Sequence, residues 1–279
     1  EQNQKVTLVA NPDWKGEKPA FSRIEYFIVT DDQAALLAYE ADSFDYTRVA
    51  MSAAKQLKAN LPKDSQLIEA QSTRYVWLTI NMNAEKLKDP RVRQAIQYAY
   101  DGDAVLQGSY DGLTGRAAGV VQPGTKFARA ANKIATRDIE KAKALLAEAG
   151  VSALEVNLYC LTDSVSQSTA QIIQSSLAEA GITVNIQPTE DAAYWALGDK
   201  TQGDGYRNIE LVLMNFAGGI DPTENLVWFR PDQIGVYNWS FFDSKEFEDL
   251  YQKGLVEQDD AKRKEISVSY THLTLPTKA

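Results

Sequence analysis

The chain has 279 residues, of which 44% are hydrophobic and 24% are charged, and its net charge is −9. This composition is ordinary for a soluble globular protein, and the length allows two domains. Lys and Arg residues are scattered, which argues against a nucleic-acid or anionic-membrane surface. The sequence has no apolar run long enough to span a bilayer, and its first residues do not resemble a secretion signal.

Residues 1–82 combine strand and helix patterns with turn residues between them. The expected strands are 5–10, 24–29, 43–46, 67–70 and 75–82. Expected helices follow Asp31 or Asp32, either of which can act as a cap, and cover residues 53–60.

The strand at 75–82 has two different faces. One face is apolar and the other is aromatic and polar, because side chains alternate along a strand. The apolar set is Val76, Leu78, Ile80 and Met82; the other set is Tyr75, Trp77, Thr79 and Asn81. Either the second face lines a ligand cleft, or another layer of the protein covers it.

Residues 89–101 are the best-defined helix of the sequence. Asp89 can cap the first turn, Pro90 suits the first helical position, and Gly102 is expected to stop the helix. The expected core stripe is Val92, Ala95, Ile96 and Ala99. Arg91 and Arg93 lie off this stripe, so we expect them to form structural ion pairs.

A regular pattern begins at residue 138, after an extended, glycine-rich segment at 108–124. A helix stopped by a glycine is followed by a strand, twice, and Ala-Glu-Ala-Gly recurs at 147–150 and 178–181. The strands are expected at 154–161 and 182–186, the helix after them at 192–197, and the third strand at 209–214. This order predicts right-handed crossovers and an α/β layer packed on a sheet.

The third strand leads into a loop at 215–223 that contains Gly218 and Gly219. Loops at the carboxyl ends of strands commonly bind ligands in α/β proteins. The two glycines either permit a close backbone approach or occupy a turn that needs positive φ. The segment downstream is rich in aromatic residues, namely Trp228, Phe229, Tyr237, Trp239, Phe241 and Phe242.

No reaction centre is recognisable in the sequence. The only histidine is His272, and the single Cys160 is expected to be a buried, inert thiol. Glu190 and Asp191 are adjacent carboxylates, which we interpret as helix caps. We therefore expect no catalytic residues, no metal and no cofactor; a hydrolase that uses distant carboxylates on a peptide or glycan is the alternative.

Several of these segments together resemble the extracytoplasmic solute-binding proteins of family 5, which serve peptide, nickel and related ABC importers. The resemblance covers nearly the whole chain. Its motifs are 11–14, 41–45, 81–83, 89–95, 145–150, 221–222 and 247–251. Residues 267–279 depart from the family pattern and look like an adapter-derived, non-native tail.

The resemblance implies an α/β fold: a type II periplasmic-binding-protein-like clamshell, here incomplete. Residues 1–82 would be part of lobe I with a hinge strand, and 83–266 lobe II, which binds ligand. The implied protein is periplasmic or anchored outside the membrane. It would be a monomer at full length, and it would capture a small polar solute or peptide and deliver it to a membrane permease.

The resemblance also suggests ligand-binding positions. They are Tyr75, Trp77, Asn215, Phe216, Gly218, Tyr237 and Trp239. The acidic residue that receives a peptide's amino group in this family would align near Gly218, where no carboxylate exists. A sugar or opine therefore becomes a credible ligand beside a peptide. A third interpretation treats the aromatic residues as an interface between lobes or with a partner.

Overall fold

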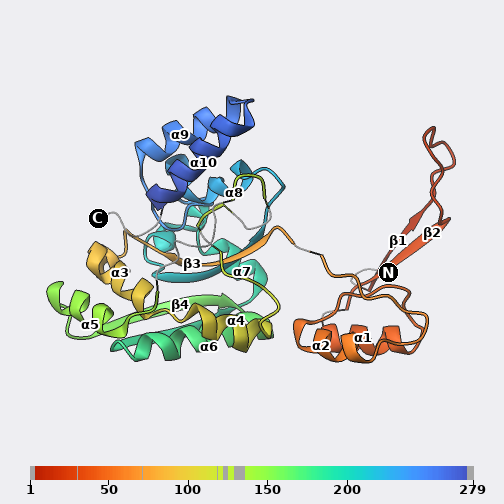
Figure 1. Cartoon of the computed structure of the whole chain (residues 1–279), viewed down its shortest axis with the longest axis horizontal. Helices are drawn as coiled ribbons and strands as arrows, with labels where there is room; N and C mark the ends of the chain where they lie inside the picture. The colour runs from red at the N-terminus through yellow and green to blue at the C-terminus, as the bar shows by residue number, and fades with distance from the viewer. Residues whose placement is uncertain are drawn as a thin grey trace. The chain divides into compact units, whose positions relative to one another are not determined.

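The computed structural model describes residues 4–29, 31–70, 72–117, 119–121, 125–128 and 136–274, with only the backbone for residue 52 and for 270–274. The chain forms two compact units, Glu1–Glu69 and Ala70–Ala279, which are described separately (Figure 1). Part of the expected tail, residues 275–279, lies outside the described residues. None of the described helices is long and apolar enough to cross a membrane.

The first unit contains an antiparallel hairpin and two helices. The hairpin pairs β1 (Lys5–Val9) with β2 (Arg23–Phe27), and the helices are α1 (Asp32–Glu40) and α2 (Met51–Ala59). Asp31 caps α1 by accepting a hydrogen bond from the Ala34 backbone N–H. The small core of this unit is formed by Leu36, Ala53 and Leu57.

The strands expected at 43–46 and 67–70 are absent, so these two predictions were wrong. Residues 41–43 instead turn back on the end of α1, where the Ser43 N–H donates to the Ala38 carbonyl. Neither segment pairs with a strand among the residues that the structure describes, and short apolar runs form strands only when such a partner is available.

The second unit is built on a four-stranded sheet in the order β3-β6-β4-β5. The strands are β3 (Arg74–Ile80), β4 (Leu154–Leu161), β5 (Ile182–Thr189) and β6 (Leu211–Ala217). β4 runs parallel to β5 and β6, whereas β3 pairs antiparallel with β6. The parallel neighbours confirm the helix-linked crossover predicted from the repeated helix–glycine–strand pattern.

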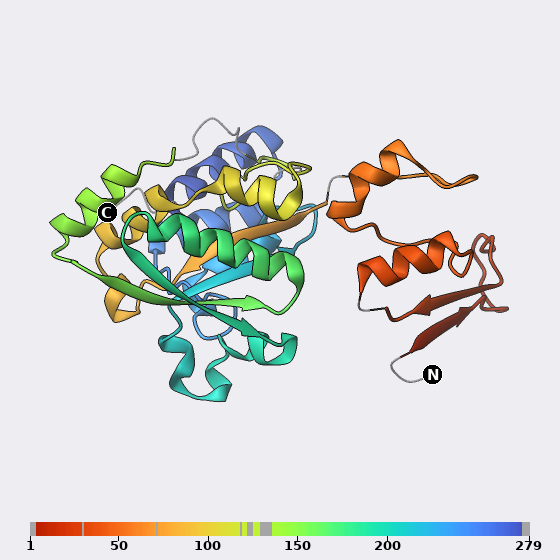
Figure 2. The ribbon, with the colours of Figure 1, turned by 90° about the horizontal axis from the view of Figure 1, so that it is seen from below.

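Helices lie on both sides of this sheet (Figure 1). The helices on the lower side in this view are α3 (Pro90–Ala99), α4 (Gly102–Tyr110), α5 (Ile139–Glu148) and α6 (Ser164–Ala178), and those on the upper side are α9 (Lys245–Val256) and α10 (Asp260–Thr274). Figure 2 shows α6, in green, alongside β4 and β5. The short helices are α7 (Asp191–Ala196), α8 (Thr223–Leu226) and the 3-10 turns Glu85–Leu87, Lys200–Gln202, Asp204–Arg207, Val227–Phe229 and Pro231–Gln233.

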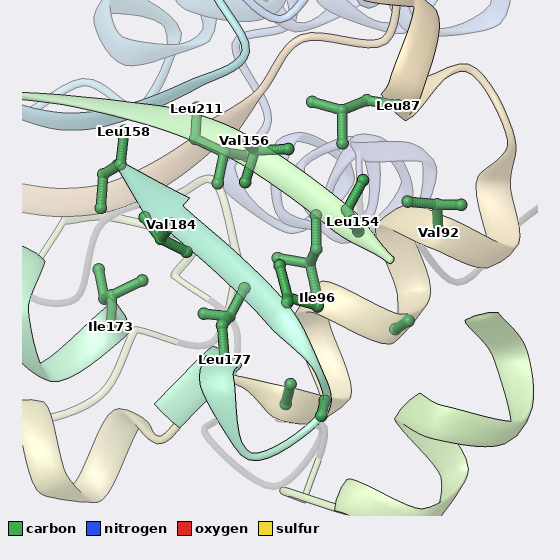
Figure 3. Close-up of a cluster of buried hydrophobic side chains, with 14 of the residues drawn as sticks. Leu87, Val92, Ile96, Leu154, Val156, Leu158, Ile173, Leu177, Val184 and Leu211 are labelled. Carbon is green, nitrogen blue, oxygen red and sulfur yellow. The ribbon is translucent and has the colours of Figure 1, made fainter. Parts of the chain in front are cut away.

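The main core lies between the sheet and α3, α5 and α6 (Figure 3). It includes the apolar face of β3, whose Val76, Leu78 and Ile80 pack against it as the alternation predicted. Figure 3 shows Ile96 of α3 and Leu177 of α6 directed toward the strands. Cys160 is fully buried here, so the prediction of a buried thiol is confirmed, and burial raises the pKa of that thiol.

Helix α3 forms as the sequence predicts. The Asp89 carboxylate accepts from the Arg91 backbone N–H at 2.8 Å, and the four residues of the predicted stripe are all buried. Gly102 does not serve as the expected stop. It is the first residue of α4, which Asp101 caps through the Ala104 N–H. Part of the segment expected to be extended, up to Tyr110, is therefore helical, because the cap at Asp101 starts a new helix.

The two arginines of α3 have structural roles. Arg91 forms an ion pair with Asp89 at 2.5 Å and donates to the Glu148 carbonyl, while Arg93 donates to the carbonyls of Leu87 and Lys88. The prediction of an ion pair is thus confirmed for Arg91, whereas Arg93 bonds to backbone instead. The Arg91 guanidinium lowers the pKa of Asp89 to about 2.

The boundary at residues 69 and 70 places β3 in the sheet of the second unit. The expected division into lobes at residues 82 and 83 stays a prediction, as does the assignment of residues 267–279 to a non-native tail. Within that stretch, residues 267–274 continue α10 as helix. Ser267 is fully buried.

Candidate functional site

The sheet face opposite the main core carries a group of aromatic side chains, here called the aromatic cluster. It consists of Trp77, Tyr194, Trp195, Phe216, Trp228, Phe229, Tyr237 and Trp239, and thus holds four of the chain's five tryptophans. These residues come from β3, β6, α7 and the segment after β6. The cluster lies where the aromatic face of β3 predicted either a cleft or a covering layer.

Strand pairing explains why β3 and β6 contribute to the same face. Tyr75 is paired with Phe216 and Trp77 with Met214, so the side chains of these four residues leave the sheet on one side. Tyr75 stacks on Trp77 at 4.8 Å, and Trp77 meets Trp228 edge-on at 5.8 Å between ring centroids. Trp77 is partly buried, so the cluster covers it without enclosing it completely.

Tyr75 is fixed at the edge of the sheet. Its hydroxyl donates to the Gly119 carbonyl at 3.0 Å, and burial raises the pKa of its phenol. The residue is therefore neutral at physiological pH. It can offer a ring face to a ligand, while its O–H is already engaged.

Asn215 lies on the opposite face of β6 from Phe216. It pairs with Val76, whose side chain packs in the main core, and its amide oxygen accepts from Arg74 at 2.9 Å. The structure therefore brings Tyr75, Trp77 and Phe216 together but separates the Asn215 side chain from them. Alternation along β6 could have shown this separation in advance.

The two glycines after β6 adopt ordinary backbone angles. Neither has a positive φ, so the interpretation as a turn that requires it was wrong. A Cβ on Gly218 would lie 2.7 Å from Asn225 Cγ, and one on Gly219 would lie 2.6 Å from Glu224 Cδ. The close approach predicted at this loop is therefore made by the protein's own side chains from α8.

Trp239 is a buried member of the cluster. Its side chain is 3% exposed, and its Nε1–H donates to the Val236 carbonyl at 2.9 Å. Tyr237, two residues earlier, is 46% exposed, and its ring centroid lies 5.3 Å from that of Trp228. Of these two predicted positions, Tyr237 lies at the rim of the cluster and Trp239 lies in its interior.

Trp195 also lies at the rim and was missed by the sequence analysis. It is 36% exposed, and its Nε1–H donates to Asp191 Oδ1 at 3.1 Å. The spacing of an acidic residue and a tryptophan four positions apart on a helix was the signal that could have found it. This contact also corrects the interpretation of Glu190 and Asp191 as caps, because neither carboxylate bonds to the first-turn amides of α7.

Two buried polar side chains of the α8 region have no hydrogen-bond partner within the described part of the chain. They are Asn225, through both amide atoms, and Trp228, through Nε1. Asn225 is 3% exposed and Trp228 is 4% exposed. A buried polar group without a partner lowers the free energy of unfolding, so these two side chains reduce the stability of the region beneath the loop.

The Asp221 carboxylate makes structural contacts with Arg263 and Thr223. Its Oδ2 lies 2.7 Å from the Arg263 guanidinium, and its Oδ1 accepts from Thr223 Oγ1 at 2.6 Å. Burial raises the pKa of this carboxyl, but hydrogen bonds from Thr223 and Arg263 outweigh burial and leave the pKa lowered. Among the described residues, no group of three or more His, Cys, Asp or Glu side chains is placed to hold a metal.

An open α/β sheet with aromatic side chains near the carboxyl ends of its strands is the architecture of a ligand-binding domain. The chain belongs to the bacterial extracellular solute-binding proteins, family 5, whose profile it matches over residues 1–233. The family is one of binding proteins, and the hydrolase alternative receives no support from it.

Named relatives give the same result. A probable di/tripeptide-binding protein of Pseudomonas aeruginosa is 28% identical over 230 residues, which cover 80% of this chain and 41% of that protein. The solved structure of AgaA with agropinic acid, from A. tumefacien R10, is 26% identical with a TM-score of 0.81, covering 99% of this chain and 56% of that one.

The structure of DppA from Helicobacter pylori with the peptide STSA has a TM-score of 0.84 at 24% identity, covering 98% of this chain and 53% of that one. This likeness shows the fold. The chain thus spans about half the length of the relatives it matches. Its fold is a partial clamshell of the periplasmic-binding-protein type, as the sequence analysis expected.

Proposed function

We propose that this protein is the solute-binding component of an ABC importer. It captures a peptide or another small polar solute against the aromatic cluster and presents it to a permease in the membrane. The observation that carries the proposal is the partly open aromatic cluster on the sheet face beside the carboxyl end of β6, in a chain that belongs to family 5. We further propose that the protein works outside the cytoplasmic membrane as a monomer.

The proposed contacts are aromatic. Tyr237 and the uncovered part of Trp77 offer ring faces, and Phe216 extends the surface beside Trp228, 5.1 Å away between ring centroids. Tyr75, stacked on Trp77, supports it from the sheet edge. Hydrogen bonds at the loop are proposed to come from the Gly218 backbone. The Asn215 side chain, which accepts from Arg74 on the opposite face of β6, is not proposed to touch the solute. Trp239 is proposed to act from beneath, by supporting the rings that touch the solute.

Two relatives suggest classes of solute. The Pseudomonas aeruginosa relative is a probable di/tripeptide-binding protein, and AgaA was solved with agropinic acid. Small solutes that carry polar groups on an organic body suit binding between an aromatic surface and loop amides. We therefore propose a small zwitterionic or acidic solute with an organic body as the general class, with peptides first.

The test is a binding titration of the 279-residue chain, labelled with 5-fluorotryptophan and followed by ¹⁹F NMR, with tripeptides, an opine and a trisaccharide as probes. Binding should shift the resonances of cluster tryptophans, and Tyr237→Ala should weaken it by about three- to tenfold. Leu255→Ala, which removes a similarly exposed side chain from α9, is the matched control and should bind as the wild type does. Failure of every probe to shift any resonance would remove the support for this proposal.

A further inference from the structure

Trp195 presents an exposed indole in a fixed orientation. Its Nε1–H is held by Asp191, and its ring packs on Tyr194 at 5.3 Å and on Trp239 at 6.0 Å between centroids. The ring of Trp228 also lies near Trp195, at 6.1 Å between centroids. Because the single N–H donor is already used, the exposed part of this indole can offer a ligand only its π surface.

The carboxylate that holds Trp195 has no cation of its own. Asp191 accepts from the indole through Oδ1 and forms no ion pair within the described residues, and the same is true of the neighbouring Glu190. Both residues are exposed. The Asp191 carboxylate, which has no ion-pair partner among the described residues, thus lies at the edge of the Trp195 indole, and Trp195 is 36% exposed.

Two arginines of the segments after α7 and β6 are engaged with other groups. Arg230 pairs with Glu248 and Asp232, and Arg207 lies over Tyr206 and contacts Asp204. The other exposed carboxylate at the strand ends, Glu224, bonds to the Gly219 N–H and pairs with no cation in the part of the chain that is described. The rim of the aromatic cluster is therefore acidic, which disfavours an anionic group at this point and favours a cationic one.

An indole face and a carboxylate together match one type of ligand group. A guanidinium is planar, stacks on tryptophan and donates two parallel hydrogen bonds to a carboxylate. We propose that Trp195 and Asp191 form a subsite for a basic side chain of the solute, of the arginine type. The proposal rests on the proposed function and narrows it: solutes with a cationic side chain are preferred.

The test compares two ligands of nearly the same shape that differ in charge at one side chain. Ala-Arg-Ala and Ala-citrulline-Ala have nearly the same shape, but citrulline carries a neutral urea group in place of the guanidinium. Dissociation constants are measured on the 279-residue chain by ¹⁹F NMR of 5-fluorotryptophan at low salt. We expect the arginine peptide to bind about fivefold more tightly, a difference that falls at high ionic strength.

Two variants locate the effect. Asp191→Asn keeps the shape and an acceptor for the Trp195 N–H but removes the charge, so the preference should fall below about twofold. Glu246→Gln removes one exposed charge from the first turn of α9 and controls for the general acidity of the chain; its preference should equal that of the wild type.

The outcomes separate the two proposals. Equal binding of the two peptides by the wild type, or an unchanged preference in Asp191→Asn, overturns the cationic subsite and leaves the proposed solute binding intact. If Asp191→Asn does not fold, Trp195→Leu takes its place with the same expectation, and the salt dependence of the wild type gives an independent result. Absence of binding by both peptides overturns the cationic subsite, whereas the proposed function falls only if the opine and the trisaccharide also fail to bind.

Discussion

The indole of Trp239 fills the space into which a Cβ on Gly198 would project. Gly198 has an ordinary backbone angle, so the position needs glycine for lack of room and not for conformational freedom. The contact joins the end of α7 to the segment after β6. This contact holds the Trp239 ring in place, and the exposed ring of Trp195 packs against Trp239 at 6.0 Å between centroids.

Gly198→Ala should therefore destabilise the second unit. Adding a methyl group where the indole lies forces Trp239 out of its packing, and overpacking of this kind costs about 2–3 kcal/mol. Urea unfolding followed by tryptophan fluorescence measures the effect, since four of the five tryptophans lie in the cluster. Gly205→Ala is the control, because a Cβ there would meet nothing within 4 Å. An equal change in both variants would contradict the packing argument.

A second prediction concerns Gly218 and Asn225. Gly218→Ala would press its methyl group against the Asn225 amide, whose Cγ would lie 2.7 Å away. We expect a loss of about 1–3 kcal/mol in the free energy of unfolding. Asn225→Ala removes a buried amide that has no partner among the described residues, so its own cost should be small.

The double variant distinguishes this contact from general loop damage. With Asn225 shortened to alanine, the methyl group at residue 218 has room, so the two changes should be less than additive by about 1 kcal/mol or more. Additive losses in the double-mutant cycle would show that Gly218 is required for a reason other than the Asn225 side chain.

The sequence predicted the sheet and its helices well in segments where the hydrophobic pattern continues over many residues. The stripe of α3 and the repeat around β4 and β5 are local patterns, and the structure confirms both. The predicted strand at 43–46 failed because a short apolar run does not reveal whether a partner strand exists. Gly102 was misread because a glycine after a helix can also begin the next one when a cap such as Asp101 precedes it.

The candidate site was harder to predict because its residues meet only through tertiary structure. Trp77 and Phe216 are 139 positions apart in sequence, and their shared face depends on the antiparallel register of β3 and β6. Strand alternation could have separated Asn215 from Phe216. In contrast, no sequence pattern revealed that Gly198 makes room for Trp239, since that contact depends on how α7 packs.

A third prediction concerns acid sensitivity. The Arg230 guanidinium donates to both oxygens of Glu248, at 2.9 and 3.1 Å, and thereby lowers the pKa of this carboxyl from its usual value of 4.5. A carboxyl whose pKa is lower in the folded state contributes stability above its unfolded pKa, near 4.5, and loses that contribution as the pH falls through the folded value. The second unit should therefore become less stable below about pH 4.5.

Glu248→Gln isolates this contribution. At pH 7 the variant should be less stable by about 1 kcal/mol, because the charge-assisted bonds to Arg230 are lost. At pH 3 its difference from the wild type should shrink, because the falling pH shifts the wild-type carboxyl toward its protonated form. Urea titrations at both pH values measure the two differences, and a constant gap between them would rule out the linkage.

The last prediction concerns the two-stranded hairpin of the first unit. Within the described ranges of the chain, β1 and β2 pair only with each other, and Val6, Leu8 and Val9 are 51%, 50% and 73% exposed. A lone two-stranded ribbon is marginally stable in water, whereas β4 has paired neighbours on both sides. Backbone amides of Lys5–Val9 should thus exchange with deuterium much faster than those of Leu154–Leu161. Mass spectrometry of peptides from the two strands makes the comparison within one sample. Equal protection would mean that a further contact covers the hairpin in solution.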